Sequence, residues 1–136
     1  MRIALPVWQD KVSPLLDTAS RLLVVVAERE RETSRFETYL EEMDISRRCQ
    51  RIHSLKIDVL ICGALSRGFS TMLMAAGTDV ISGITGRVED VLKAYFHKTI
   101  FDSNYLMPGY GTDSPIQTDP SSRYKKEQPN EIPEEL

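Results

Sequence analysis

Ile57-Asp-Val-Leu-Ile-Cys-Gly63 is the stretch of sequence that decides the fold. It is a nearly continuous run of β-branched and apolar residues, and it stops at a glycine. Such a run is typical of a strand that is covered on both faces, as parallel strands between helices are. We therefore predict that residues 57–62 form the central strand of an α/β domain.

Before this strand, apolar residues recur every three to four positions, as they do in a helix. Asp44 is suited to be the N-cap of a helix whose apolar stripe contains Ile45, Cys49 and Ile52. The opposite face carries three arginines, Arg47, Arg48 and Arg51. We interpret it as an exposed face and not as a nucleic-acid patch, because no aromatic residues accompany it.

Helical spacing also follows the strand. Ser66 is suited to cap a second helix, which Gly77 ends in the manner of a C-cap glycine. A short strand over residues 79–84 and a helix from Val88 to about Lys98 complete the pattern.

The first forty residues have the pattern of strands without helices. Residues 2–7 and 21–28 are apolar runs, and residues 33–40 alternate well enough to be a returning edge strand. Residues 8–20 have no period and are predicted to be a long loop. Together with the later elements, this predicts a mixed five-stranded sheet with three helices on its faces.

Composition limits the classes of protein. The 136 residues suffice for one domain with a hydrophobic core, and the formal net charge of −3 disfavours nucleic acid and membranes as partners. No apolar run approaches the length of a membrane span. With only Cys49 and Cys62, a disulfide framework is not expected, so we predict a cytoplasmic protein.

Residues 101–136 differ from the rest. They hold five of the seven prolines, and their seven acidic and three basic residues give a charge of −4. We predict a domain over residues 1–100 and a flexible, acidic, proline-rich tail over 101–136. Residues 101–110 contain Tyr105, Leu106 and Met107 and are expected to pack back on the domain, with free chain from about Gly111.

Several motifs together resemble the dinitrogenase iron-molybdenum cofactor biosynthesis family. They are Met1-Arg-Ile-Ala-Leu-Pro-Val7, Val12-Ser-Pro-Leu-Leu-Asp-Thr-Ala19, Ala75-Ala-Gly-Thr-Asp-Val80 and Gly86-Arg-Val-Glu-Asp-Val-Leu92. The resemblance spans the domain and none of the far tail. It implies a ribonuclease H-like three-layer fold, and a nitrogenase accessory protein that binds, stores or delivers a metal-sulfur cofactor, often without catalysis.

The chain departs from the family at a candidate ligand. The family has a histidine after the proline of its VSPHFG-type segment, whereas this chain has Leu15, and Asp17 replaces the glycine. Leucine cannot ligate a metal, so residue 15 cannot deliver a cluster in that way. The segment 105–110 resembles an MPGC ending of some relatives, with Tyr110 in the place of its cysteine.

Three side chains are candidate metal ligands. Cys49 and His53 are four residues apart on one predicted helix and can share a soft or borderline metal with Cys62, which ends the central strand. The alternative is that both cysteines are small core residues and His53 is a border residue.

The turn after the central strand is a candidate anion site. Backbone N–H groups near Gly63, Ser66 and Gly68, with Arg67 beside them and Ser13 opposite, would suit molybdate or the sulfides of a cluster. An ordinary strand-to-helix turn explains the same residues. Arg21 and Arg87 lie near other element ends, where they are suited to neutralise an anion.

Catalysis is not expected. The first strand lacks the carboxylate that two-metal nucleases need, and Ser13 has no nearby base in the sequence. The leading hypothesis is a non-catalytic accessory protein that carries a metal-sulfur cofactor or related anionic metal species. The alternative is a protein-interaction module that acts through its domain surface and acidic tail.

Overall fold

The computed structural model describes residues 1–101 and 105–107. In chain order its elements are β1 (Arg2–Trp8), β2 (Lys11–Val12), a 3-10 helix (Leu16–Thr18), β3 (Arg21–Glu28), β4 (Arg31–Tyr39), α1 (Ile45–Ser54), β5 (Val59–Ile61), α2 (Arg67–Ala75), β6 (Asp79–Ile81) and α3 (Val88–Phe96). One mixed sheet and three α-helices in the described part confirm the predicted α/β class. No helix of that part is long and apolar enough to cross a membrane.

The sheet has the strand order β4-β3-β1-β5-β6, and β2 pairs with β1. β1 is antiparallel to β3 but parallel to β5, and β5 is parallel to β6. The edge position predicted for residues 33–40 is confirmed by β4. The loop prediction for residues 8–20 is wrong at β2, where Val7 pairs with Val12. β2 has only two residues, which is too few for periodicity to detect.

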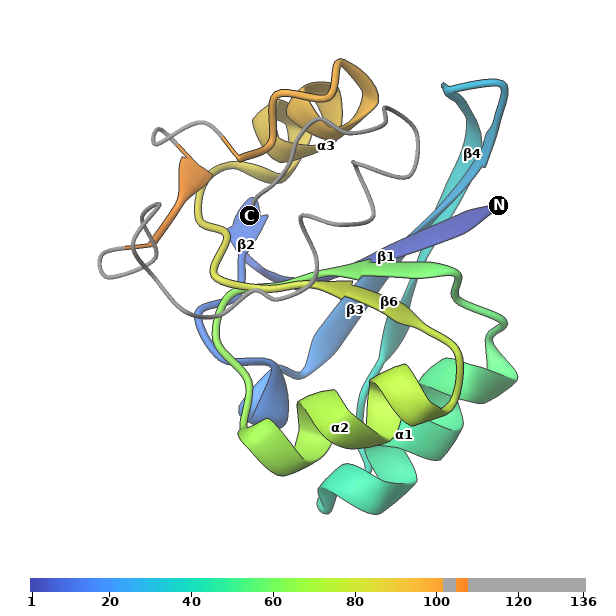
Figure 1. The fold of residues 1–136 in the computed structure, drawn as a ribbon, viewed down its shortest axis with the longest axis vertical. Helices are drawn as coiled ribbons and strands as arrows, with labels where there is room; N and C mark the ends of the chain where they lie inside the picture. Colours follow the sequence, from blue (N-terminus) through green and yellow to red (C-terminus); the bar gives the residue numbers. More distant parts are fainter. Residues whose placement is uncertain (102–104, 108–136) are drawn as a thin grey trace, which may run out of the picture.

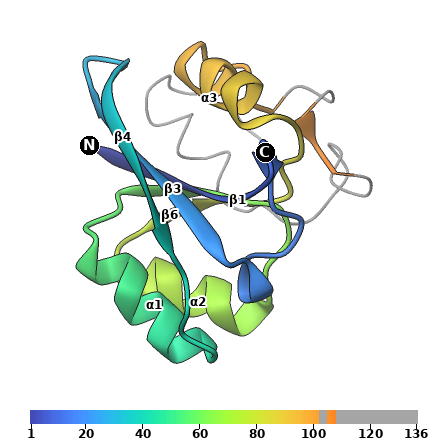
Figure 2. The ribbon, with the colours of Figure 1, turned by 180° about the vertical axis from the view of Figure 1, so that it is seen from behind.

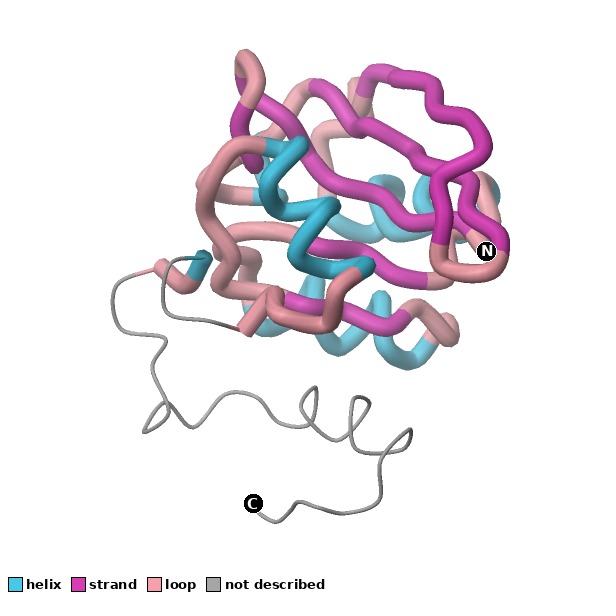
Figure 3. Tube along the Cα trace, turned by 90° about the horizontal axis from the view of Figure 1, so that it is seen from above, coloured by secondary structure: helices cyan, strands magenta, loops and turns pink. Residues whose placement is uncertain are grey.

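The sheet lies between two layers of helices (Figures 1 and 2). α1 and α2 lie together on one face, and α3 covers the other face, where it crosses in front of the strands in Figure 3. Successive residues of β1 point to opposite faces. Ile3 and Leu5 join the apolar cluster under α3, and Ala4 joins the cluster under α1 and α2. Each face of the sheet thus has its own core.

The predicted helix boundaries at Asp44, Ser66 and Gly77 are confirmed. The Asp44 carboxylate accepts a hydrogen bond from Arg47 N–H at 3.3 Å, and Ser66 Oγ accepts one from Phe69 N–H at 3.3 Å. Gly77 follows α2 with a φ of +94°. A residue without Cβ adopts this conformation at least cost, so the helix ends there.

Three elements are shorter than predicted. β5 spans only Val59–Ile61 of the predicted 57–62, and the other two are β6 and α3. β6 ends at Ile81, and Gly83 then takes a φ of +78°, which turns the chain away from the strand direction. α3 ends at Phe96, and Lys98 has a φ of +62° that no helix accommodates. In β6 and α3 a residue with positive φ ends the element before the apolar pattern does.

The prediction of an exposed arginine face on α1 is wrong at Arg48. Arg47 is exposed, whereas Arg48 is only 5% exposed. Arg48 lies between Asp44 and Ile52 on the helix, at the border of the apolar stripe. Main chain near residues 16–19 and 40–42 covers that border. The periodicity of one helix carries no information about such distant segments.

Residues 105–107 contact the segment that follows β6. Leu106 forms an antiparallel bridge with Ile84, and Thr85 N–H donates to the Tyr105 carbonyl at 2.8 Å. The domain boundary near residue 100 stays a prediction. The free chain expected from Gly111, and most of the predicted tail, lie outside the described residues.

Candidate functional site

The carboxyl ends of β1, β5 and β6 meet at one edge of the sheet, because these strands are parallel. Segment 13–18 follows β2, which pairs with the end of β1, and segments 62–67 and 83–87 come after β5 and β6; we call the three together the carboxyl-edge platform. Ligand sites of α/β domains commonly lie at this edge. The platform contains every residue predicted to bind a cofactor, namely Ser13, Cys62, Gly63, Ser66 and Arg67.

Main-chain hydrogen bonds join the three segments of the platform. Leu16 N–H donates to the Ala64 carbonyl at 2.9 Å, and Ala64 N–H donates to the Pro14 carbonyl at 2.8 Å. On the other side, Gly83 N–H donates to the Gly63 carbonyl at 2.8 Å. The platform is therefore one connected layer and not three independent loops.

Gly63 is required by the close approach of segment 13–18. A Cβ atom at residue 63 would lie 2.7 Å from the Pro14 carbonyl oxygen and 2.8 Å from that of Ser13. Main-chain atoms cannot swing away as a side chain does, so a larger residue must displace the loop. Ser13 is buried, and its N–H donates to the Pro6 carbonyl at 2.8 Å. Packing explains Gly63, and its role in anion binding stays a prediction.

Asp17 contacts the start of α2. Ser66 N–H donates to Asp17 Oδ1 at 2.8 Å, while Ser66 Oγ accepts from Phe69 N–H. The backbone N–H expected to hold an anionic ligand thus already has a carboxylate acceptor, which the chain itself supplies. Sequence reasoning missed this contact. Its signal was an acidic residue where the resembled family has glycine.

Two arginines lie on the exposed rim of the platform. Arg67 is the first residue of α2 and is exposed. Arg87 is the N-cap residue of α3, and its Nη1 lies 3.0 Å from Asp10 Oδ2 in an exposed ion pair. Guanidinium groups in such positions favour the approach of oxyanions and sulfide-rich anions.

The three predicted metal ligands are not brought together. Cys49 and Cys62 are buried in the apolar cluster under α1 and α2. His53 is exposed and lines a cavity of about 430 Å³ with Lys56 and Asp58, at the opposite edge of the sheet. Within residues 1–101 and 105–107, no group of three His, Cys, Asp or Glu side chains is placed to hold a metal ion.

Burial also changes the acidity of the two cysteines. Burial, with a smaller effect of the Asp17 charge, raises the pKa of the Cys62 thiol to about 12. Burial likewise raises the pKa of Cys49. Nucleophilic cysteines act as thiolates, so buried thiols with a raised pKa are poor nucleophiles. Ligation of a metal by Cys49 or Cys62 stays a prediction.

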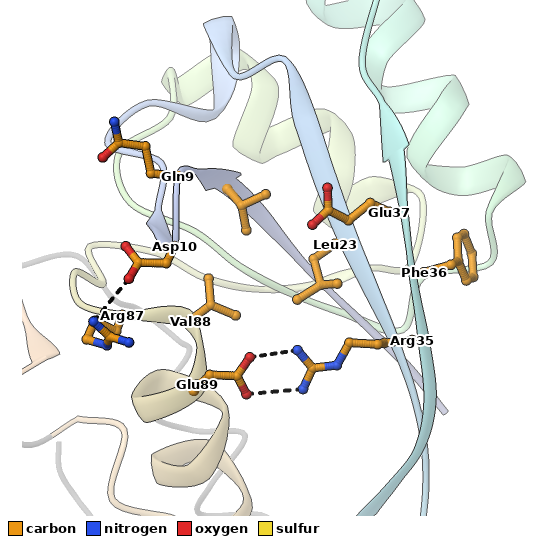
Figure 4. Close-up of a pocket in the computed structure, with 10 residues that line it drawn as sticks. Gln9, Asp10, Leu23, Arg35, Phe36, Glu37, Arg87, Val88 and Glu89 are labelled. Carbon is orange, nitrogen blue, oxygen red and sulfur yellow. Dashed lines mark hydrogen bonds and ion pairs between the residues drawn. The ribbon is translucent and has the colours of Figure 1, made fainter.

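A second cavity of about 280 Å³ lies between β4 and the start of α3 (Figure 4). Two ion pairs border it: Arg35 Nη1 lies 2.8 Å from Glu89 Oε2, and Arg87 pairs with Asp10. Its apolar lining residues are Val7, Leu23, Phe36 and Val88. Sequence reasoning missed this cavity because the lining residues come from segments that only the tertiary fold brings together.

The fold and the platform define a class: an α/β domain with a mixed sheet, helices on both faces and interlocked loops at the carboxyl edge. Solved structures with this fold include those of three proteins. The protein PH0822 gives a TM-score of 0.70 at 20% identity, over 74% of this chain and 92% of that chain. A candidate dinitrogenase from Methanocaldococcus jannaschii gives 0.61 at 14% identity, over 74% of this chain and 91% of that one.

The third is the apo form of the orange protein from Desulfovibrio gigas, with a TM-score of 0.58 at 20% identity, over 73% of this chain and 89% of that chain. No family model matches this chain, and no curated protein matches it. At these identities the likeness establishes the fold alone.

Proposed function

We propose that the protein is a non-catalytic accessory protein whose carboxyl-edge platform binds a metal-sulfur species of the iron-molybdenum type, or a related anionic metal species, as cargo. The fold that it shares with a candidate dinitrogenase and with the orange protein supports this proposal. The motifs that resemble the iron-molybdenum cofactor biosynthesis family support it as well. The same resemblance supports assigning the sheet to the ribonuclease H-like type.

The observation that carries the proposal is the hydrogen-bonded platform with two exposed guanidinium groups on its rim. Its three segments are fixed by main-chain contacts, so little conformational entropy is lost when a ligand binds. Arg67 and Arg87 supply positive charge at that edge. Arg87 shares its charge with Asp10, and Arg67 is exposed, so the rim offers guanidinium N–H groups on a preorganised surface, which suits the holding of an anion without reaction.

The residues present fit a cargo that is held without ligation to its metal. Leu15 has no donor atom, Cys62 is fully buried as a protonated thiol, and His53 lies at the other edge of the sheet. Charge and hydrogen bonds to sulfide or oxide atoms are the contacts that the platform offers. The expected affinity therefore depends on salt, which screens exposed charges.

Anaerobic reconstitution of the full chain with iron, molybdate and sulfide tests the proposal. We expect a coloured protein that retains metal after desalting, detected by its visible spectrum and by metal analysis. Replacing both rim arginines, Arg67→Gln and Arg87→Gln, is expected to remove most of the bound metal. The matched control is Arg29→Gln, in the exposed turn between β3 and β4 at the opposite edge. A colourless, metal-free wild type with unchanged stability would overturn the proposal.

A second candidate function is a protein-interaction module that acts through the domain surface and the acidic tail. It is favoured by Leu15, which is 38% exposed on the platform, and by Asp17, which takes the Ser66 N–H. Deleting residues 108–136 separates the two functions and keeps the bridge between Leu106 and Ile84. A module of this kind loses its protein partner on truncation, whereas a cargo carrier keeps its metal.

A further inference from the structure

Arg48 is a buried cation that binds main chain from several segments. Its guanidinium donates to four carbonyl oxygens: Nε to Glu42 at 2.8 Å, Nη1 to Leu16 at 3.2 Å and to Ala19 at 2.6 Å, and Nη2 to Leu40 at 3.4 Å. Within the described part of the chain, no carboxylate forms an ion pair with it. Its charge is therefore compensated by main-chain dipoles.

Such a site requires arginine. Removing a cation from water is costly unless hydrogen bonds replace its hydration. Arginine has five N–H donors in a rigid plane, whereas lysine has three donors around one nitrogen. One ammonium group cannot reach carbonyls from the 16–19 and 40–42 segments with the same geometry. The guanidinium thus holds these segments in a fixed relation to α1.

Two of its four acceptors belong to the platform or adjoin it. The carbonyls of Leu16 and Ala19 are the ends of a short turn, and Asp17 lies between them. Leu16 N–H donates to Ala64, and the Asp17 carboxylate accepts from Ser66 N–H. Each side of this turn therefore has a partner: Arg48 on one side and the strand-to-helix turn before α2 on the other.

We infer that Arg48 is a positioning residue for the carboxyl-edge platform. It fixes residues 16–19, and so the Asp17 contact with α2, from a helix that does not itself belong to the platform. Loss of the guanidinium frees this turn while the rest of the sheet stays paired. The consequence for cargo binding rests on the proposed function, whereas the consequence for the turn does not.

Amide hydrogen exchange of the full chain tests the inference. The amide of Asp79, which donates to Asp58 at the opposite edge, is the internal reference and reports the loss of global stability. In Arg48→Met we expect exchange at Leu16 and Ser66 to rise roughly 100-fold more than at Asp79, since several charge-assisted hydrogen bonds to their turn are lost together. Equal increases at all three amides would overturn the inference, because they would show global destabilisation alone.

Arg51→Met is the matched control. Arg51 lies on the same helix and donates from Nη2 to Thr38 Oγ1 at 2.6 Å, away from the platform. This variant is expected to leave the exchange of Leu16 and Ser66 unchanged. An increase as large as that in Arg48→Met would overturn the inference.

Added guanidinium ion can replace the lost side-chain group of Arg48, but it cannot repair a general loss of packing. Restored slow exchange therefore distinguishes the two causes. In Arg48→Ala, guanidinium chloride at sub-denaturing concentration is expected to restore slow exchange at Leu16 and Ser66, and sodium chloride is not. No difference between the two salts would count against the inference. Should Arg48→Ala fail to fold, Arg48→Lys serves in its place, with exchange expected to rise at Leu16 but not at Asp79.

Reconstitution of the same variants separates this inference from the proposed function. Arg48→Met is expected to lose most of its bound metal, and guanidinium ion to restore it in Arg48→Ala. If exchange responds as described and neither the wild type nor any variant binds metal, the proposed function fails and the positioning role of Arg48 stands.

Discussion

Arg48 and Arg35 both join segments that are distant in sequence, but in opposite surroundings. Arg48 is buried and donates to carbonyl groups, whereas Arg35 is partly exposed and donates to the carboxylates of Glu32 and Glu89. Water and salt screen the second arrangement and not the first. The comparison indicates that main-chain contacts hold the platform side of the domain rigidly, while charge pairs border the cavity side loosely.

The largest expected effect is at Arg48. Arg48→Met is expected to lower the free energy of unfolding by about 3–5 kcal/mol, because several buried carbonyl groups lose their donor at once. Urea denaturation measures this change. Exposed ion pairs contribute less than about 1 kcal/mol to stability. If Arg48→Met lowers the free energy of unfolding by no more than that, the Arg48 contacts are no stronger than the exposed Arg35 pairs.

The next effect is at Gly63. Gly63→Ala is expected to cost about 2–3 kcal/mol, because its Cβ meets two main-chain oxygens at 2.7 and 2.8 Å. Gly68→Ala is the matched control: it lies in α2, its Cβ would be 3.6 Å from Ile45 Cδ1, and alanine favours helices by about 0.5–1 kcal/mol. Thermal unfolding is expected to move in opposite directions for the two variants.

The third prediction concerns how the buried Cys62 thiol makes the free energy of unfolding depend on pH. Its pKa is raised from an ordinary 9.0 to about 12, so above pH 9 the unfolded thiol loses its proton while the folded one keeps it. The stabilising effect is complete below pH 9 and is lost as pH rises toward 12. Cys62→Ala removes this dependence. The difference in unfolding free energy between wild type and variant is expected to shrink with rising pH, and a constant difference would contradict the assignment.

The smallest effect is on the cavity side. Hydrogen bonding to Arg35 lowers the pKa of Glu89, so its contribution is present at neutral pH and is lost on acidification through the folded-state pKa. The Glu89 side chain is 66% exposed. Glu89→Gln is therefore expected to cost less than about 1 kcal/mol, and less still at high salt. A cost that salt does not reduce would mean that this pair is as protected as Arg48.

Much of the fold was predictable because its signals are local. Asp44, Ser66 and Gly77 fixed helix ends through their own side chains or lack of one, and the apolar run at residues 57–62 indicated a covered strand. The two-residue strand β2 and the early end of β6 were not predictable, because hairpin pairing and a left-handed glycine decided them.

The candidate site was predictable only in its location. The turn around Gly63 and Ser66 follows β5, and sites at that edge are common in α/β domains. β5 is an inner strand as predicted, but the central position predicted for residues 57–62 is wrong, because β1 is the middle strand of the order. The contact between Asp17 and Ser66 joins residues that are 49 apart in sequence, and the cavity beside Glu89 joins residues from four elements. No periodicity connects such residues, so they become visible only in the folded chain.

The sequence by itself determined the three helices, the strands longer than two residues and most of their apolar faces, since these depend on neighbours within a few residues. Tertiary structure alone decided that Arg48 is buried, that Asp17 reaches α2 and that Cys62 and His53 lie apart. The physical reason is that burial of a polar group depends on which distant main-chain atoms compensate it, and strand order sets those partners.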